Sequence, residues 1–138
     1  MQTLTPLKKL AADANVILSA TAGKAALRIF LKKEIEIVTT EFNIDEVREY
    51  LGAIAEQYSL SEEVLESQLR LLPLTTYPRH FYKDLLTKAA MKLSGRDEDD
   101  IELLALAMKL EIPIWSNDND FKDSGIEIYT TARLLKIL

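Results

Sequence analysis

The stretch that decides the fold runs from Arg96 to Phe121 and reads RDEDDIELLALAMKLEIPIWSNDNDF. It contains an acidic cluster, a helical segment, a short apolar strand and a second acidic cluster, in that order. Only Glu102 and Lys109 are charged between positions 101 and 110, so this helix is expected to be covered on more than one side. The carboxylates at both ends of so apolar a run are therefore expected near the surface, at the rim of a site.

The size and composition of the chain indicate one globular domain spanning residues 1–138. Its apolar fraction of 48% and charged fraction of 28% are ordinary for such a domain. No apolar run approaches the roughly 18 residues of a membrane span, and the N-terminus lacks the pattern of a signal peptide. The absence of cysteine excludes disulfides and thiolate sites, and it is compatible with the cytoplasmic location that we expect.

The charge of the chain limits the ligands that it can hold. A net charge of −5 argues against binding nucleic acid by bulk attraction, but metal ions held by carboxylates would supply positive charge that meets phosphate. Because His80 is the one histidine, a zinc site of imidazoles is disfavoured, and oxygen ligands indicate magnesium or manganese. The chain also has scattered basic residues that could line a substrate path but are more typical of solvated surface: Lys24, Arg28, Arg48, Arg79 and Arg96.

Strand-like and helix-like segments alternate along the chain. The strands are expected near residues 10–12, 35–40, 72–77, 112–115 and 126–129. The helices are expected from residue 16 onward and over 24–33, 41–58, 59–72, 79–93, 101–110 and 131–138. This alternation predicts an α/β fold, a three-layer α/β/α sandwich with a mainly parallel sheet of about five strands. Pro73 and Pro78 make the third strand an edge strand or a weak one.

Four acidic positions recur at comparable places in this pattern. Asp13 follows the first strand, Glu46 lies in the first turn of the helix after the second, and Asp118 follows the fourth. Asp100 stands at the head of the helix that leads into the fourth strand. Since sites in parallel sheets form beyond the carboxyl ends of the strands, the four predict one pocket. Ionised carboxylates in one pocket repel, and we expect Asp13, Asp100 and Asp118 to bind Mg²⁺ or Mn²⁺ for metal-assisted hydrolysis.

Each acid also has a purely structural interpretation. Asp13 is a good helix N-cap, and Asn43 with Glu46 resembles a capping box. The acids at 97–100 match the dipole of a helix start. One residue is enough to cap a helix, however, and four consecutive acids add mutual repulsion, so the pattern as a whole favours a site.

Four segments together resemble the PIN domain ribonucleases, a family that includes the VapC-like toxins. They read DANVILSA from Asp13, DEVREYL from Asp45, RDEDDIELLALA from Arg96 and IPIWSNDNDF from Ile112. The resemblance covers essentially the whole chain, in the order and spacing of the family.

The resemblance implies roles for particular residues. The four family acids would be Asp13, Glu46, Asp100 and Asp118. Asn15 matches a polar residue two positions after the first acid, and Ser116 stands where a hydroxyl could hydrogen-bond an acidic ligand. Asp97, Asp99 and Asp120 match acids that vary in the family, and whether Asp97 or Asp99 shares the work of the third acid is open.

The resemblance also implies an activity and partners. The chain would be a magnesium- or manganese-dependent endoribonuclease of single-stranded or structured RNA, forming a homodimer, with an antitoxin partner if it is a toxin. The alternative is a catalytically idle PIN-like interaction module, or a toxin held permanently by its antitoxin. A receiver domain would need an aspartate ending the strand at 72–77, and a haloacid-dehalogenase-like phosphatase would need one where Asn15 stands.

Overall fold

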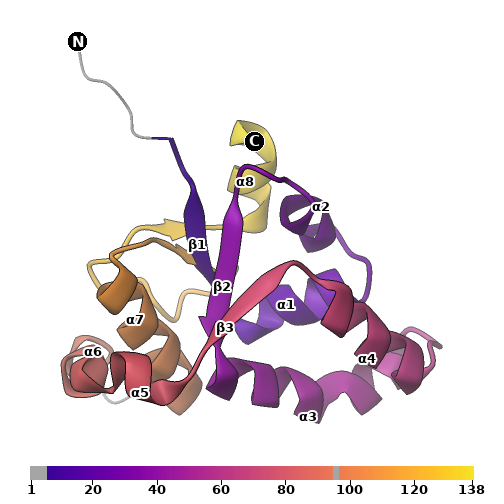
Figure 1. Cartoon of the computed structure of the whole chain (residues 1–138), viewed down its shortest axis with the longest axis horizontal. Coiled ribbons are helices and arrows are strands. Elements are labelled where there is room, and N and C mark those ends of the chain that lie inside the picture. The colour runs from indigo at the N-terminus through magenta and orange to yellow at the C-terminus, as the bar shows by residue number, and fades with distance from the viewer. Residues whose placement is uncertain (1–5, 95–96) are drawn as a thin grey trace.

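Five parallel strands form one sheet in the order β3-β2-β1-β4-β5, with β1 at its centre (Figure 1). This computed structural model describes residues 6–94 and 97–138. The strands are β1 (Lys9–Ala12), β2 (Glu36–Thr40), β3 (Leu74–Tyr77), β4 (Ile114–Trp115) and β5 (Ile128–Tyr129). The predicted parallel sheet is confirmed, and β3 lies at its edge, as its two flanking prolines indicated.

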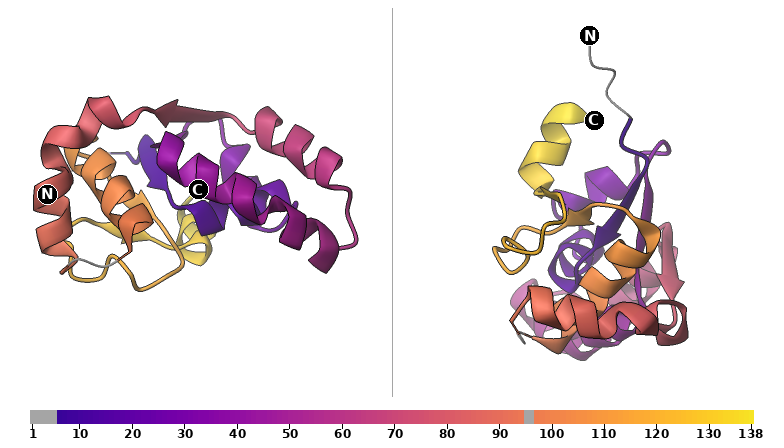
Figure 2. Two further views of the ribbon diagram at one scale, coloured as in Figure 1. Left: turned by 90° about the horizontal axis from the view of Figure 1, so that it is seen from below. Right: turned by 90° about the vertical axis from the view of Figure 1, so that its left-hand side faces the viewer.

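Helices cover both faces of the sheet and complete the predicted α/β/α sandwich (Figures 1 and 2). One face packs against α1 (Ala14–Thr21), α2 (Ala26–Phe30), α3 (Glu41–Gln57), α4 (Glu62–Leu71) and α8 (Thr131–Ile137). The other face packs against α5 (Arg79–Tyr82), the 3-10 helix η1 (Lys83–Leu85), α6 (Leu86–Lys92) and α7 (Glu98–Leu110). Within the described residues, no helix is long and apolar enough to cross a membrane.

Helix α7 is as deeply buried as its sequence predicts. Every residue from Leu103 to Ala107 is completely buried, between the sheet and helix α6. The helix ends at Glu111, which adopts a left-handed conformation at φ 56° and turns the chain into β4. The position of α7 therefore fixes where its acidic N-terminus lies relative to the sheet.

The sheet order creates a switch point between β1 and β4. The chain leaves β1 towards β2 on one side, whereas β4 pairs with β1 on the other side. Such a point opens a crevice at the carboxyl ends of the strands. Two hydrogen bonds fix these ends: Oγ1 of Thr39 donates to the Ala12 carbonyl at 2.8 Å, and the Asp13 amide donates to the Trp115 carbonyl at 3.1 Å.

Some helix boundaries differ from those predicted. The helix expected over 24–33 is only α2, and the helix expected over 79–93 is divided into α5, η1 and α6. Helix α4 begins later than expected, because Ser61 rather than Ser59 is its N-cap and accepts from the Val64 amide. Ser59 instead takes a left-handed conformation at φ 54° in the turn after α3.

Candidate metal centre

A small hollow of about 100 Å³ lies at the switch point of the sheet. Its lining is Asp13, Ala14, Asn15, Asn43, Glu46, Asp97, Asp99, Asp100, Asp118 and Asp120. The structure thus brings together every acid predicted for the site, and we name this hollow the acidic pocket. At roughly 30 Å³ per water molecule, it has room for an ion with a few waters but not for a nucleotide.

Asp13 is held at the junction of β1 and α1. Its Oδ1 accepts a hydrogen bond from the Val16 amide at 3.0 Å, so it does cap α1, and the helix begins at Ala14 rather than at the predicted Val16. Its side chain is buried, with only 6% of the residue exposed. Ser116, fully buried beneath the pocket, also hydrogen-bonds this carboxylate. The structural and the functional interpretations of Asp13 are therefore compatible.

Glu46 lies in the second turn of α3, not in the first as predicted. The helix starts at Glu41, and its N-cap is Thr40, whose hydroxyl accepts from the Asn43 amide at 2.8 Å. The predicted capping box of Asn43 with Glu46 is therefore wrong, because the capping interaction lies three residues earlier. Free of any capping role, the Glu46 side chain turns towards the head of α7, where Asp99 lies beside it.

Asn43 lines the pocket, although sequence reasoning assigned it only to a cap. It is 2% exposed, and its Nδ2 donates to the Asp99 carbonyl at 3.3 Å. This bond ties the start of α3 to the start of α7 and so sets the separation of Glu46 from Asp100. A polar residue on the buried stripe beside Ile44 and Val47 was the one signal in the sequence.

The three aspartates at the head of α7 have different surroundings. Asp97 is the N-cap, since its Oδ1 accepts from the Asp99 amide at 2.9 Å. Asp97 is exposed, whereas Asp99 and Asp100 are half-buried. Charge repulsion reaches Asp100 from Asp120, Asp97, Asp13 and Asp99, which places it at the centre of the acidic pocket.

The loop after β4 supplies the remaining acids. The Asp118 amide donates to Oγ of Ser116 at 3.1 Å, and Oδ2 of Asp118 accepts from Nδ2 of Asn15 at 2.9 Å. Ser116 thus links Asp13 and Asp118, and Asn15 holds Asp118 towards α1. Asp120 lies close enough to raise the pKa of both Asp13 and Asp100.

Burial and mutual repulsion make the ionised form of three carboxyl groups in this pocket less favourable. Burial is the largest cause at three positions, and repulsion from neighbouring aspartates adds to it. The pKa of Asp13 is raised to about 6, that of Asp100 to about 7 and that of Glu46 to about 8. Once protonated, the Glu46 carboxyl can donate a hydrogen bond to Asp99. The pocket therefore holds more negative charge than the surrounding protein compensates.

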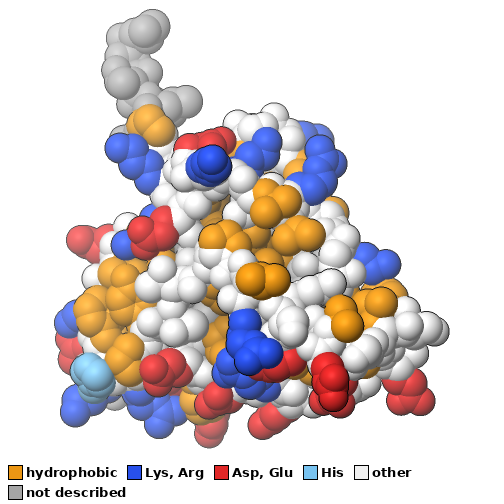
Figure 3. Space-filling view, turned by 45° about the vertical axis from the view of Figure 1, so that its right-hand side comes forward, with side chains coloured by type: hydrophobic (Ala, Val, Ile, Leu, Met, Phe, Trp, Pro, Cys, Tyr) orange, Lys and Arg blue, Asp and Glu red, His pale blue; other side chains and the backbone are white. Residues whose placement is uncertain are grey.

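No lysine or arginine of the described residues lines the acidic pocket. Arg48 and Arg79 pair instead with Glu66 and Glu102, and Arg96 lies outside the described residues. On the face drawn in Figure 3, basic and acidic side chains are interspersed, without a broad area of positive charge. Among the described residues, the negative charge of the pocket is therefore left to a cation from outside the chain.

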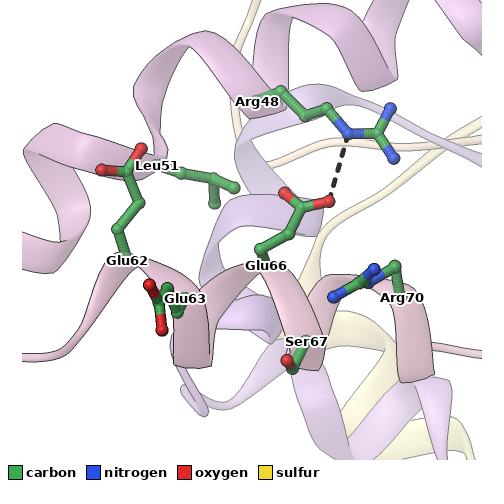
Figure 4. A pocket seen from close by; sticks show the side chains of 7 residues that line it. All are labelled: Arg48, Leu51, Glu62, Glu63, Glu66, Ser67 and Arg70. Atoms are coloured by element: carbon green, nitrogen blue, oxygen red, sulfur yellow. Dashed lines mark hydrogen bonds and ion pairs between the residues drawn. The ribbon is translucent and has the colours of Figure 1, made fainter.

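A larger hollow of about 530 Å³ lies between α3 and α4 (Figure 4). It also contains carboxylates, but there Arg48 donates from Nε to Glu66 at 3.5 Å, and Arg70 stands in the same lining. Glu62 and Glu63 are exposed to solvent. This hollow has its own basic groups and lacks buried acids, so the smaller acidic pocket is the better candidate for a metal.

The side chains of the acidic pocket fit a hard divalent cation. All its potential ligands are oxygens, the donors that Mg²⁺ and Mn²⁺ prefer. Oε2 of Glu46 is buried and lacks a hydrogen-bond partner among the described residues, as expected of an atom that meets a cation or its water. Within residues 6–94 and 97–138, no three acidic or histidine side chains lie close enough together to hold a metal ion.

A family model described as PIN domain matches residues 12–138. The chain belongs to the PIN domain family. This match confirms the resemblance drawn from the sequence, at the level of the PIN domain but not of the VapC-like subtype. A search of curated proteins found no match. PIN domains are generally nucleases and typically use divalent metal ions, which agrees with an all-oxygen pocket at the switch point.

Proposed function

We propose that this PIN domain is a metal-dependent endoribonuclease that hydrolyses RNA phosphodiester bonds at the acidic pocket. The observation that carries the proposal is the set of half-buried and buried carboxylates from three separate chain segments, with no basic residue of the described chain among them. Such a site is costly without a cation and is suited to Mg²⁺ or Mn²⁺. Residues 1–138 would form a single nuclease domain.

Asp13, Asp100 and Asp118 are the proposed ligands. When bound, a divalent ion polarises a phosphate oxygen and lowers the pKa of a coordinated water. Ser116 and Asn15 orient the ligands, because Ser116 hydrogen-bonds Asp13 and the Asp118 amide, while Asn15 donates to Asp118. Two of the three proposed ligands, Asp13 and Asp118, are thus oriented by hydrogen bonds to neighbouring residues, as metal sites commonly require.

Glu46 has a different proposed role. Its Oε2 has no partner within the described residues, and its pKa of about 8 lies near neutral pH. A carboxyl group in this range can take up or release a proton at that atom during hydrolysis. Asp97, Asp99 and Asp120 add negative charge around the ligands, and Asp97 in addition caps α7.

The test is manganese-dependent cleavage of a mixed pool of single-stranded RNA by the full chain. We expect cleavage by the parent and a loss of at least about 100-fold in Asp13→Asn and Asp118→Asn, the order of effect seen when an electrostatic catalytic group is removed. Asp84→Asn is the matched control, since Asp84 is an exposed aspartate paired with Lys109 away from the pocket. Circular dichroism establishes that each variant is folded.

Folded variants that cleave as well as the parent would overturn the nuclease assignment. A parent that binds manganese yet cleaves no RNA would favour the alternative, an idle PIN-like interaction module.

The proposed partners are a second copy of the chain and, for a toxin, an antitoxin segment that enters the acidic pocket. An apolar groove lined by Leu27, Leu31 and Leu71 supports a protein partner, because Leu31 and Leu71 are 66% and 81% exposed. Light scattering on the purified chain distinguishes a monomer from a homodimer. A cytoplasmic location is part of the same proposal.

A further inference from the structure

A strip of surface along α1 and α3 leads away from the acidic pocket. The two helices pack side by side (Figures 1 and 2). They run in the same direction, because Asp13 and Glu46, towards their N-terminal ends, share the pocket. Beyond their C-terminal ends, Nζ of Lys24 lies 4.3 Å from the ring centroid of Tyr58. The strip therefore begins at the pocket and ends at Lys24.

On the α3 side of this strip, a row of uncharged residues follows Glu46. Tyr50, Ala53 and Gln57 follow Glu46 at steps of three or four residues, so the four occupy one face of the helix. All three are exposed, and Tyr50 is 50% exposed. The exposed acids Glu49 and Glu56 border this row on one side, since Glu49 lies three residues after Glu46 and Glu56 three residues after Ala53. The row thus offers uncharged contacts between the pocket and Lys24, with acids along one edge.

Tyr50 has the position of a support for a nucleotide. It lies one helical turn after Glu46, about 6 Å along the helix axis. A single exposed aromatic residue is ordinary on a protein surface. Here, however, the acidic pocket is too small for a nucleotide at about 100 Å³, so the neighbours of a phosphate bound there must lie outside it. Tyr50 presents an exposed ring where the first of these neighbours would pass.

Lys24 provides a positive charge at the far end. The described part of the chain contains no carboxylate that forms an ion pair with Lys24. The Tyr58 ring steadies its ammonium group by a cation–π contact, which leaves the charge available to an anion. An exposed aromatic ring beside the pocket and a lysine at the far end of the strip match the two components of single-strand recognition, base stacking and phosphate attraction.

We propose that Tyr50 stacks against a base of single-stranded RNA next to the phosphate held at the acidic pocket, and that Lys24 meets a phosphate further along the same strand. This inference rests on the proposed nuclease function and names its substrate class and binding direction. Duplex RNA would bind poorly, because its bases are already stacked on each other and are not free to meet Tyr50.

Fluorescence anisotropy with a labelled single-stranded 2′-O-methyl oligouridine of ten residues tests the proposal, in manganese-containing buffer and with the oligomer checked for cleavage after titration. We expect Tyr50→Leu to weaken binding at least about 5-fold and Tyr50→Phe to retain it within about 2-fold, since stacking requires a ring. Tyr50→Trp should show fluorescence quenched by the oligomer, whereas Trp115 of the parent is fully buried and should not. The same strand annealed to its complement should bind more weakly than the free strand.

Salt dependence tests Lys24 separately. Lys24→Gln should lower the slope of log affinity against log salt by about 0.7, the value for one phosphate contact on a single strand. Lys136→Gln, at an exposed lysine of α8, should leave the slope unchanged and is the matched control. Glu49→Gln, on the neighbouring face of α3, controls for changes near Tyr50.

The outcomes separate this strip from the nuclease function. The proposed binding strip is wrong if Tyr50→Leu binds the oligomer as tightly as the parent does. It is also wrong if the parent does not bind the single strand, even when manganese-dependent cleavage is present. Binding that depends on the ring at position 50 supports the strip even if no cleavage is found, and in that case only the nuclease assignment fails.

Discussion

Two carboxylates on α7, two residues apart, illustrate opposite ways of placing an acid inside a protein. Glu102 is 5% exposed and fully paired: Arg79 donates from Nη2 to Oε2 at 2.9 Å and from Nε to Oε1 at 3.1 Å. The Tyr82 hydroxyl also donates to Oε1. Asp100 is half-buried among other acids, and burial with repulsion raises its pKa to about 7.

The difference shows which buried acid belongs to the fold and which is available for chemistry. An arginine with two parallel hydrogen bonds compensates Glu102 within the chain, so this residue holds α5 and α7 together. No basic side chain of the described residues lines the pocket around Asp100. A buried acid whose charge is left uncompensated by its own chain indicates a site for a ligand of opposite charge.

The largest effect expected from this comparison is stabilisation by metal. Manganese at 100 times its dissociation constant should stabilise the parent by about 2.7 kcal/mol, because it binds the folded chain and not the unfolded one. Asp100→Asn should lose most of this gain, whereas Arg79→Met should keep it. Thermal denaturation with and without manganese measures the effect. If manganese does not raise the melting temperature of the parent, Asp100 does not differ from Glu102 in binding a metal.

A smaller effect is expected at the paired acid. Arg79→Met leaves the Glu102 carboxylate buried with only Tyr82, which should destabilise the protein by about 2 kcal/mol; Arg79 is half-exposed, so the full cost of breaking a buried pair does not apply. The double variant Arg79→Met with Glu102→Gln should recover part of the loss. Urea denaturation measures both variants. If the single variant unfolds like the parent, Glu102 is not held by its arginine.

The smallest expected effect is a stabilisation: loss of the Asp100 carboxylate should raise the free energy of unfolding, whereas loss of Arg79 lowers it. In the folded chain the pKa of Asp100 is raised from 3.8 to about 7, so between these values the folded state holds more protons than the unfolded state. Stability of the metal-free protein should therefore fall as pH rises through this window. Asp100→Asn should stabilise the metal-free protein at pH 8 by about 1 kcal/mol, reduced for solvent screening, and change little near pH 4.

Asp84→Asn is the control for this pH dependence. The hydrogen bond from Lys109 lowers the pKa of Asp84, so loss of this exposed carboxylate should not stabilise the protein at any pH. Urea denaturation at pH 4, 6 and 8 compares the two variants. A destabilised Asp100→Asn at pH 8 without metal would show that Asp100 is compensated within the chain after all.

Local pattern was enough to predict the framework of this protein. The alternation of β-branched strands with amphipathic helices predicted the α/β sandwich, and the apolar run of α7 predicted that this helix is covered on more than one side. The carboxyl ends of parallel strands lie at one edge of the sheet, so Asp13 and Asp118 could be placed together from their positions in the chain. The metal roles of these acids remain predictions.

Helix boundaries and N-caps were harder to predict from the sequence, because several residues near the start of a helix can accept hydrogen bonds from the same backbone amides. Thr40 rather than Asn43 caps α3, and Ser61 caps α4, which had been expected to begin at Ser59. With its cap at Thr40, α3 has Glu46 in its second turn and outside any capping box. A difference of three residues in the position of the cap thus changed the interpretation of Glu46 without changing the fold.

The sequence by itself determined the order of strands and helices, the depth of α7 and the edge of the sheet at which the acids gather, since these follow from periodicity and from residues near one another in the chain. Only the tertiary structure decided which charges meet. It paired Arg79 with Glu102, tied Asn43 to the Asp99 carbonyl, and set Lys24 over Tyr58 at the end of the strip that starts beside Glu46. These contacts depend on how whole helices pack, and no local pattern encodes them.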